Sequence, residues 1–223
     1  MIELINISKT YEDGDQKIGA VRDVSLKVEQ GDFVSIVGHS GSGKTTLLSL
    51  IGGLTRPDKG SLVMDGTDIW TLSDDAMSEF RNKNVNFIFQ FASLVPTLTV
   101  LENVLLPSAF GSCCEGLDEY ARSLIDMVGL GDKVATYPHR LSGGQQRRVA
   151  IARAFINSPK VVLADEPTGD LDEATEAEIM KIFRAQNERG ATFIIVTHNQ
   201  SLAASAKRRF RMTAGVLSEE GGS

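Results

Sequence analysis

The fold of this chain is decided by the stretch Gly38-His39-Ser40-Gly41-Ser42-Gly43-Lys44-Thr45. An apolar run rich in β-branched residues, 33–37, precedes this stretch, and the sequence Thr-Thr-Leu-Leu-Ser-Leu-Ile of residues 45–51 follows it. The first run is typical of a buried strand, and the second predicts a buried helix that ends near Gly52 and Gly53. We therefore expect a strand, a glycine-rich loop and a helix in succession.

The glycine-rich loop matches the pattern G-x-x-x-x-G-K-[ST], which binds phosphate groups. Glycines let the backbone curl until several N–H groups point at one phosphate chain, and the following helix presents its positive end to the same anion. Lys44 can then reach the β- and γ-phosphates of a nucleotide, and the Thr45 hydroxyl can bind Mg²⁺. A flexible glycine loop is the alternative, and the flanking strand and helix argue against it. The nucleotide-binding residues expected here are Gly38, His39, Ser40, Gly41, Ser42, Gly43, Lys44, Thr45 and Thr46.

A second apolar run, 161–164, ends in the carboxylates Asp165 and Glu166. Such a run predicts a buried parallel strand, and the carboxyl ends of these strands deliver side chains to ligand sites. Asp165 is placed to hold Mg²⁺, and Glu166 is placed to polarise an attacking water. An apolar strand that ends in two acids is common and mostly structural when it stands alone. Here the catalytic interpretation is favoured because the strand follows a phosphate-binding loop in the sequence.

The sequence Leu141-Ser142-Gly143-Gly144-Gln145 stands immediately before a helical pattern. Ser142 can cap that helix, and the glycines allow a close approach of the backbone, so the helix start offers a second anion site. A plain helix cap after a loop is the structural alternative. Because the first loop already surrounds one side of a triphosphate, a second phosphate-binding motif is most useful when another subunit supplies it.

The order of the patterns predicts an α/β fold, a phosphate-loop NTPase core with a parallel sheet, over residues 1–90 and 159–223. The segment 91–158 lacks strong strand patterns and carries helical ones at 119–128 and 145–157, with Pro159 after them, so we expect an inserted helical subdomain. Alternating residues between Ile2 and Val28, with a turn at Asp13 and Gly14, predict a small N-terminal antiparallel sheet.

Over essentially its whole length the sequence resembles the ATP-binding cassette (ABC) family, in which LSGGQ is the signature motif. The resemblance implies that two subunits sandwich two ATP molecules head to tail. It implies that Tyr11 stacks on adenine, that Gln90 contacts Mg²⁺ and the attacking water, and that His198 touches the γ-phosphate. The loop 169–172 would cross the dimer interface through Asp170 and Asp172. The catalytic set is then Lys44, Gln90, Glu166 and His198, the Mg²⁺ set is Thr45, Gln90 and Asp165, and the set that acts on the other subunit's ATP is Ser142, Gly143, Gly144 and Gln145.

Two positions depart from the family pattern. Asp170 stands where related proteins often have Asn or Ala, and Asn199 stands where Asp is frequent. The runs 51–57, 87–90 and 94–104 look like those of the macrolide-export, lipoprotein-release, haem-export and cell-division ATPases. That group pairs with permeases that have few transmembrane helices, and some of its members transmit force without carrying cargo. The resemblance therefore implies an integral membrane permease as partner.

Composition bears on the partners and on the compartment. The chain has 29 acidic and 23 basic residues, a formal net charge of −6, which argues against nucleic acid as a partner. The only cysteines, Cys113 and Cys114, are neighbours and cannot join distant parts of the fold, which fits a reducing compartment. No run is apolar enough to span a bilayer, and residues 1–4 do not resemble a signal peptide. We therefore expect a peripheral protein, held at the cytoplasmic face of a membrane by the permease.

A soluble ABC protein that acts on DNA, on ribosomes or on cluster assembly is the rival hypothesis. Only about fifty residues separate Gln90 from Leu141, which is too few for long coiled coils, and the chain has one cassette rather than two. A membrane partner is therefore favoured, while the transported substrate and the direction of transport stay open. For the basic cluster formed by Lys207, Arg208, Arg209 and Arg211, a solvated face is favoured over lipid or partner contact. The tail 219–223 is expected to be disordered.

Overall fold

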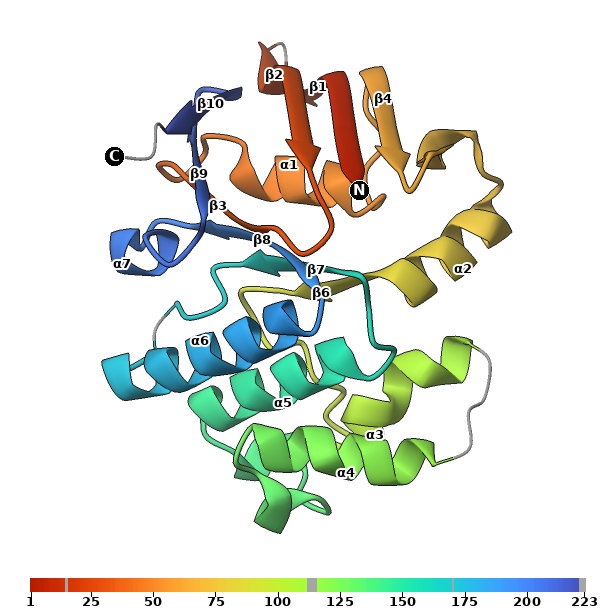
Figure 1. The fold of residues 1–223 in the computed structure, drawn as a ribbon, viewed down its shortest axis with the longest axis vertical. Helices are drawn as coiled ribbons and strands as arrows, with labels where there is room; N and C mark the ends of the chain where they lie inside the picture. The colour runs from red at the N-terminus through yellow and green to blue at the C-terminus, as the bar shows by residue number, and fades with distance from the viewer. Residues whose placement is uncertain (15, 112–115, 170, 221–223) are drawn as a thin grey trace.

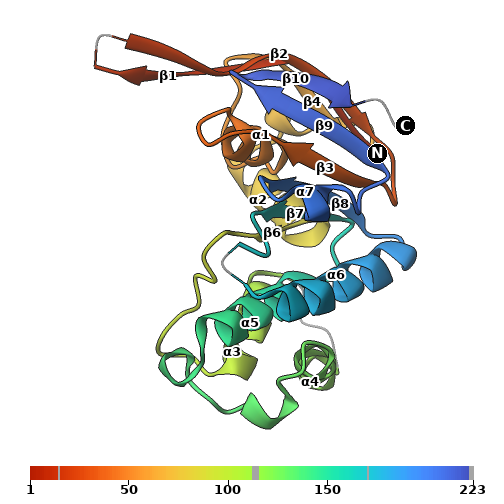
Figure 2. The same ribbon diagram turned by 90° about the vertical axis from the view of Figure 1, so that its left-hand side faces the viewer.

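The computed structural model describes residues 1–14, 16–111, 116–169 and 171–220. In this part of the chain the strands form two sheets, with the order β10-β9-β3-β8-β7-β6 in the larger and β2-β1-β4-β5 in the smaller. The two sheets lie in one half of the molecule and most of the helices in the other (Figures 1 and 2). The expected α/β architecture is observed.

The larger sheet is parallel from β9 to β6, and only β10 runs antiparallel to its neighbour. Its strands are β3 (Phe33–Val37), β6 (Val85–Ile88), β7 (Val161–Asp165), β8 (Thr192–Thr197), β9 (Arg208–Thr213) and β10 (Val216–Glu220). Every residue of β3 and β8 is buried, as continuous apolar runs require. Because β3, β8, β7 and β6 are parallel neighbours, the segments that follow them meet at one edge of the sheet.

The smaller sheet is antiparallel and contains the expected N-terminal hairpin. Its strands are β1 (Ile2–Asp13), β2 (Gln16–Val28), β4 (Lys59–Met64) and β5 (Thr67–Asp68). Apolar side chains on its inner face join one buried cluster with α1 (Lys44–Ile51), the helix after the glycine-rich loop. The paired strands β1 and β2 extend beyond the body of the molecule (Figure 2).

The helices α3 to α6 cover the other face of the larger sheet. The α-helices after α1 are α2 (Asp74–Asn84), α3 (Val100–Leu105), α4 (Leu117–Met127), α5 (Gly143–Phe155), α6 (Glu173–Glu188) and α7 (Gln200–Ala203), and the 3₁₀ turns are η1 (Ile69–Thr71), η2 (Leu106–Phe110), η3 (Gly131–Lys133) and η4 (Pro138–Arg140). Phe155 of α5 and Phe183 of α6 contact Phe193 of β8, with ring centroids 6.4 and 5.2 Å apart. The helical segment therefore shares its apolar core with the sheet, and its division from the core as a separate subdomain stays a prediction.

Two expectations change at the C-terminal end. Glu219 and Glu220 complete β10 and form ion pairs with Arg208 and Arg211, so the expected disorder is wrong for these two residues. Arg208 also donates to the carbonyl of Lys27 at 2.7 Å and is only partly exposed, so it is not part of a freely solvated face. The antiparallel β9–β10 pairing explains the order of the two acids, because it places them on the strand beside the one that carries Arg208 and Arg211.

Some expectations fall outside the described residues, namely those for Asp170, Cys113, Cys114 and the last three residues of the tail. In the part of the chain that the structure describes, no helix combines the length and the apolar character that crossing a membrane requires.

Candidate functional site

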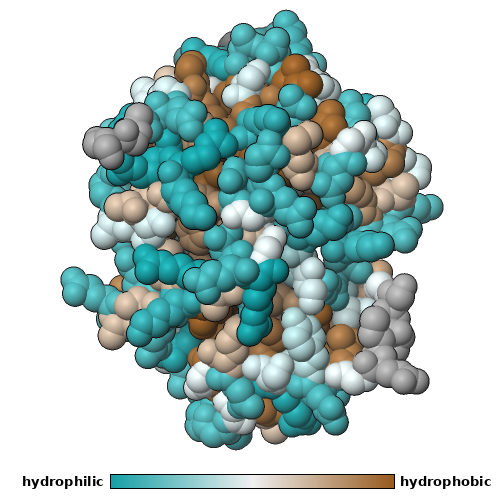
Figure 3. Space-filling view, in the orientation of Figure 1, coloured by the Kyte–Doolittle hydropathy of each residue, from teal (hydrophilic) through white to brown (hydrophobic). Residues whose placement is uncertain are grey.

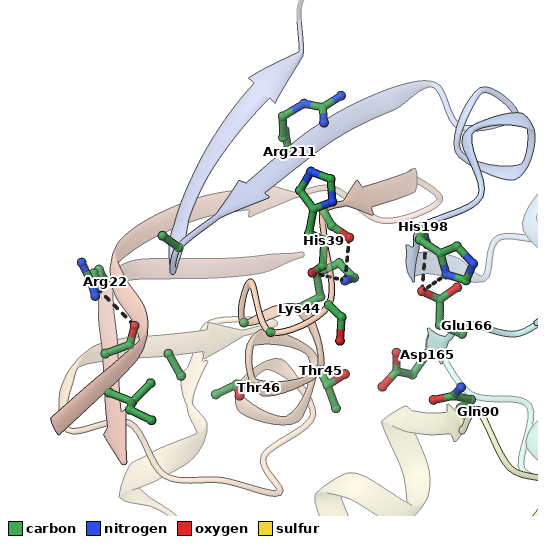
Figure 4. A pocket seen from close by; sticks show the side chains of 18 of the residues that line it. Arg22, His39, Lys44, Thr45, Thr46, Gln90, Asp165, Glu166, His198 and Arg211 are labelled. Carbon is green, nitrogen blue, oxygen red and sulfur yellow. Dashed lines mark hydrogen bonds and ion pairs between the residues drawn. The ribbon is translucent and has the colours of Figure 1, made fainter. Parts of the chain in front are cut away.

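A pocket of about 910 Å³ lies at the edge where the parallel strands end (Figure 4). Its residues come from four strand ends. The glycine-rich loop follows β3, Gln90 follows β6, Asp165 ends β7 with Glu166 after it, and His198 follows β8. The predicted residues that line the pocket are Gly38, His39, Ser40, Gly41, Gly43, Lys44, Thr45, Thr46, Gln90, Asp165, Glu166 and His198. The sheet topology thus brings together predicted residues that are distant in the sequence, such as Gly38 and His198.

Close packing of the glycine-rich loop explains two of its glycines. A Cβ atom on Gly38 would collide with the Met212 carbonyl of β9, and one on Gly43 would collide with the Ala20 carbonyl of β2. Gly43 also has a φ of 104°, which disfavours residues with a side chain. The loop therefore packs closely against β9 and β2 and is not a flexible glycine linker.

Lys44 and Thr45 lie at the start of α1 and line the pocket. The Lys44 ammonium donates to the carbonyls of Gly38 and His39 at 2.8 and 3.0 Å, so it bridges its own loop. The Thr45 hydroxyl and the Asp165 carboxylate face the same pocket (Figure 4). Burial raises the pKa of the Asp165 carboxyl, and the charge of Glu166 acts in the same direction, whereas Thr45 and Lys44 oppose the rise.

Mg²⁺ prefers oxygen ligands and keeps several waters and phosphate oxygens in its shell. The Thr45 hydroxyl, the Asp165 carboxylate and the Gln90 side-chain amide face the same pocket and provide ligands of this type (Figure 4). This donor set fits Mg²⁺ bound together with a nucleotide.

Glu166 is held by the last residue of β8 and the residue that follows it. Its Oε1 accepts the backbone N–H of His198 at 2.9 Å and lies 2.8 Å from His198 Nδ1, and its Oε2 accepts the Thr197 hydroxyl at 2.8 Å. The side chain of Glu166 is 12% exposed and that of His198 is 74% exposed. Glu166 has a φ of 45°, an uncommon value for a residue with a side chain, and such strain concentrates at functional sites.

The signature segment forms the start of α5 and lies outside this pocket. The Ser142 hydroxyl accepts the N–H of Gln145 at 3.2 Å, and the Gln145 side chain accepts the N–H of Ser142 at 3.0 Å, a complete capping box. Ser142, Gly143, Gly144 and Gln145 are absent from the lining of the pocket in the same chain. Figure 2 shows α1 and α5 in opposite halves of the molecule.

Three other predicted residues also lie outside the pocket lining. Ser42 is a buried residue of the loop. Asp172 caps α6 by accepting from the N–H and the hydroxyl of Thr175. Tyr11 is 42% exposed on β1, where it pairs with Ile18 of β2.

The pocket also contains residues that the sequence analysis missed, namely Ile18, Gly19, Ala20, Arg22, Gln200, Arg211 and Ala214. Ile18 could have been found, because a hairpin that turns at Asp13 and Gly14 places it opposite Tyr11. The presence of Arg211 depends on β9 lying beside β3, which no local pattern indicates.

Comparison with known proteins shows the family of this chain. A family model described as "ABC transporter" matches residues 21–169, which cover most of the chain. This protein belongs to the ABC transporter family. The cassette is 44% identical over 226 residues to a macrolide export ATP-binding/permease protein of Syntrophobacter fumaroxidans, an alignment that covers 100% of the cassette and 32% of the relative. It thus spans about a third of the length of such relatives.

Stand-alone relatives and solved structures match over nearly the whole chain. A lipoprotein-releasing system ATP-binding protein of Geobacter metallireducens is 42% identical over 217 residues, with 96% of both chains covered. Two solved dimeric structures of the cassette MJ0796, one of them bound to ADP and Pi in a post-hydrolysis state, share 38% and 39% identity, each with a TM-score of 0.92 and full coverage of both chains. The expected family, fold and ATPase class are therefore confirmed.

Proposed function

We propose that two copies of this cassette close on two molecules of Mg-ATP, hydrolyse them and thereby drive a membrane permease. One observation carries the proposal: the strand-end residues converge on a phosphate-binding pocket, while the signature helix of the same chain lies elsewhere. A second copy of the chain is then needed to bring a signature helix to the exposed side of the nucleotide. The dimeric state of the MJ0796 structures supports this arrangement.

Different residues of the pocket would bind the phosphates, the Mg²⁺ and the adenine of ATP. Lys44 would leave the carbonyls of Gly38 and His39 for the β- and γ-phosphates, because a phosphate is a stronger partner for an ammonium than a carbonyl is. Thr45, Gln90 and Asp165 would hold Mg²⁺, which supplies charge neutralisation on the phosphate oxygens when bound. Tyr11, with Ile18 opposite it, would provide the surface for the adenine.

Hydrolysis would depend on Glu166 as the general base. Its carboxylate is fixed by Thr197 and His198, so it can accept a proton from a water held at the γ-phosphate without first being ordered. His198 is largely exposed, and its ring would exchange its contact with Glu166 for one with the γ-phosphate. The Gln90 amide would orient the same water. The chemistry is mainly positioning and charge neutralisation.

The permease belongs to the proposal because relatives of this cassette carry macrolide export and lipoprotein release in their names. Two aromatic side chains beside Gln90 are exposed, Phe89 at 44% and Phe91 at 75%. Exposed aromatic residues are common in binding surfaces. Next to the nucleotide pocket, they would let a bound partner respond when the cassette dimer closes. We propose that the segment 91–99 contacts the permease at the cytoplasmic face of the membrane. A photoreactive residue at Phe91 should then label an integral membrane protein in cells, whereas one at Val216 should not.

The substitution Glu166→Gln tests the hydrolytic role. The amide keeps the shape of the side chain and cannot accept the proton, so ATP should bind with the parental Kd while kcat falls by about a hundredfold or more. The variant should also accumulate as an ATP-bound dimer in light scattering. Glu188→Gln, an exposed change at the end of α6, is the matched control and should keep the parental rate. Hydrolysis at the parental rate by Glu166→Gln would show that another group is the base.

A further inference from the structure

Glu176, in the first turn of α6, contacts the segment that follows β8. Its Oε2 accepts a hydrogen bond from the side-chain Nδ2 of Asn199 at 3.0 Å, and both side chains are half-buried. Among the residues that the structure describes, no lysine, arginine or histidine forms an ion pair with Glu176. The amide of Asn199 is therefore the polar partner of this carboxylate in the described part of the chain.

The contacts of Asn199 fix the orientation of its side-chain amide. Its Oδ1 accepts the N–H of Ser201 at 2.9 Å and that of Leu202 at 3.3 Å, and it thereby caps α7. Its Nδ2 faces the carboxylate of Glu176. Backbone N–H groups need an acceptor and a carboxylate needs a donor, so only one orientation of the amide satisfies both sides. Asparagine is the residue that offers an acceptor and a donor here.

The departure from the family pattern at position 199 has a physical reason in this contact. An aspartate, which is frequent at this position in related proteins, would cap α7 as well as Asn199 does. It would also place a second carboxylate directly against that of Glu176, and like charges this close repel. Asn199 and Glu176 are therefore a matched pair in this chain.

Asn199 is connected to the proposed base through Thr197. The backbone N–H of Asn199 donates to the Thr197 hydroxyl oxygen at 3.0 Å, and the same hydroxyl donates to Oε2 of Glu166 at 2.8 Å. A hydroxyl carries a single proton, so the N–H that it accepts leaves this proton to Glu166. Thr197 is buried, and satisfied polar networks of this kind make a site rigid. A continuous path of hydrogen-bonded residues thus runs from Glu176 to Glu166.

We propose that Glu176 is a positioning residue for Glu166: by holding Asn199, it fixes the Thr197 hydroxyl that orients the carboxylate of the proposed base. The inference rests on the proposed role of Glu166 in hydrolysis. Neither Glu176 nor Asn199 lines the nucleotide pocket, so the pair acts through Thr197 and not on ATP. The rate of hydrolysis, and not the affinity for ATP, then depends on the pair.

Asn199→Asp tests the pairing, because it keeps the cap of α7 and sets two carboxylates against each other. The kcat should fall about tenfold, since small misplacements of a catalytic group are costly, and the Kd for ATP should stay unchanged. Adding Glu176→Gln should restore kcat to near the parental value, because the glutamine amide donates to the new carboxylate. The double variant thus carries the same contact with donor and acceptor exchanged.

Glu173→Gln is the matched control for charge. Glu173 is the other acid in the first turn of α6 and is exposed, so its substitution removes the same charge from the same turn without touching Asn199. It should not restore kcat in Asn199→Asp. Equal rescue by Glu173→Gln would mean that general charge and not the contact matters, and it would overturn the inference.

Single substitutions of Glu176 give a second measurement that does not require Asn199→Asp to fold. Glu176→Gln keeps an oxygen that accepts the Asn199 amide, so its kcat should be parental. Glu176→Ala leaves that amide without its acceptor, and its kcat should fall several-fold at an unchanged Kd for ATP. Equal kcat values for the two variants, measured per folded molecule, would overturn the inference.

A double-mutant cycle shows whether the pair acts through Thr197. In a Thr197→Val background the path to Glu166 is already cut, so Asn199→Asp should cause no further loss of kcat. An equal fold-loss in both backgrounds, a parental kcat for Asn199→Asp alone, or no rescue by Glu176→Gln would overturn the inference. A parental kcat for Glu166→Gln would instead contradict the proposed function, so the two failures are distinguishable.

Discussion

Glu166 and His198 contact each other twice: Oε1 of Glu166 accepts the backbone N–H of His198 at 2.9 Å and lies 2.8 Å from its ring nitrogen Nδ1. The other carboxylate oxygen accepts the hydroxyl of Thr197 at 2.8 Å. The proposed base, which directly follows β7, is therefore oriented by the end of β8 before any nucleotide arrives. This arrangement makes Thr197 a residue that should matter for rate, although it has no role in the sequence motifs.

Thr197→Val removes the hydroxyl that orients Oε2 of Glu166 while keeping the side-chain volume. We expect kcat to fall about tenfold with little change in the Kd for ATP, because the phosphate-binding loop is untouched. The matched control is Thr192→Val at the other end of β8, whose hydroxyl accepts the N–H of Gly31. Both residues are buried, so both variants should lose stability, but only Thr197→Val should lose activity per folded molecule. Equal activities would contradict the orienting role.

Lys44→Ala should remove most of the affinity for ATP. A hydrogen bond to a charged group is worth up to about 3 kcal/mol, which corresponds to roughly a hundredfold in Kd. Calorimetry with ATP and Mg²⁺ measures the change, and Lys59→Ala, an exposed position on β4, provides the control. Near-parental binding by Lys44→Ala would remove the basis for assigning the phosphate site.

Tyr11→Ala should weaken nucleotide binding without altering phosphate chemistry. Stacking of a base on an aromatic ring is worth roughly 1–3 kcal/mol, and we expect the lower part of this range because Tyr11 stays partly exposed. ATP and GTP should lose similar affinity, since a stacked ring face discriminates little between them. Phe110→Ala removes a ring that is 77% exposed and does not line the pocket, so it should leave Kd unchanged. An unchanged Kd for Tyr11→Ala would point to Ile18 as the main adenine contact.

The sequence predicted well what local patterns specify. The glycine-rich loop, the strand ending in Asp165 and Glu166, and the capped start of α5 all lie where apolar runs and capping residues indicated. Parallel pairing then brought Gln90 and His198 to the same edge, as strand ends must.

Contacts between distant segments could not be predicted in this way. Arg211 reaches the pocket because β9 pairs with β3, and Arg153 reaches Ser93 across 60 positions because α5 packs beside the loop after β6. The expected disorder of Glu219 and Glu220 failed for the same reason, since their partners are arginines on the preceding strand. Local composition indicates solvation at such positions, whereas tertiary pairing decides the outcome.

We propose that Ser142 acts on the nucleotide held by the Lys44 of another copy. Cysteines at Ser40 and Ser142, introduced into a chain whose Cys113 and Cys114 are replaced by serine, test it with a short bis-maleimide. The Glu166→Gln background keeps ATP unhydrolysed, and each single-cysteine chain serves as a control. We predict covalent dimers that form with ATP and Mg²⁺ and that are absent without nucleotide. Crosslinks within one chain, or dimers that form equally without ATP, would show that Ser142 does not act on the nucleotide of another copy.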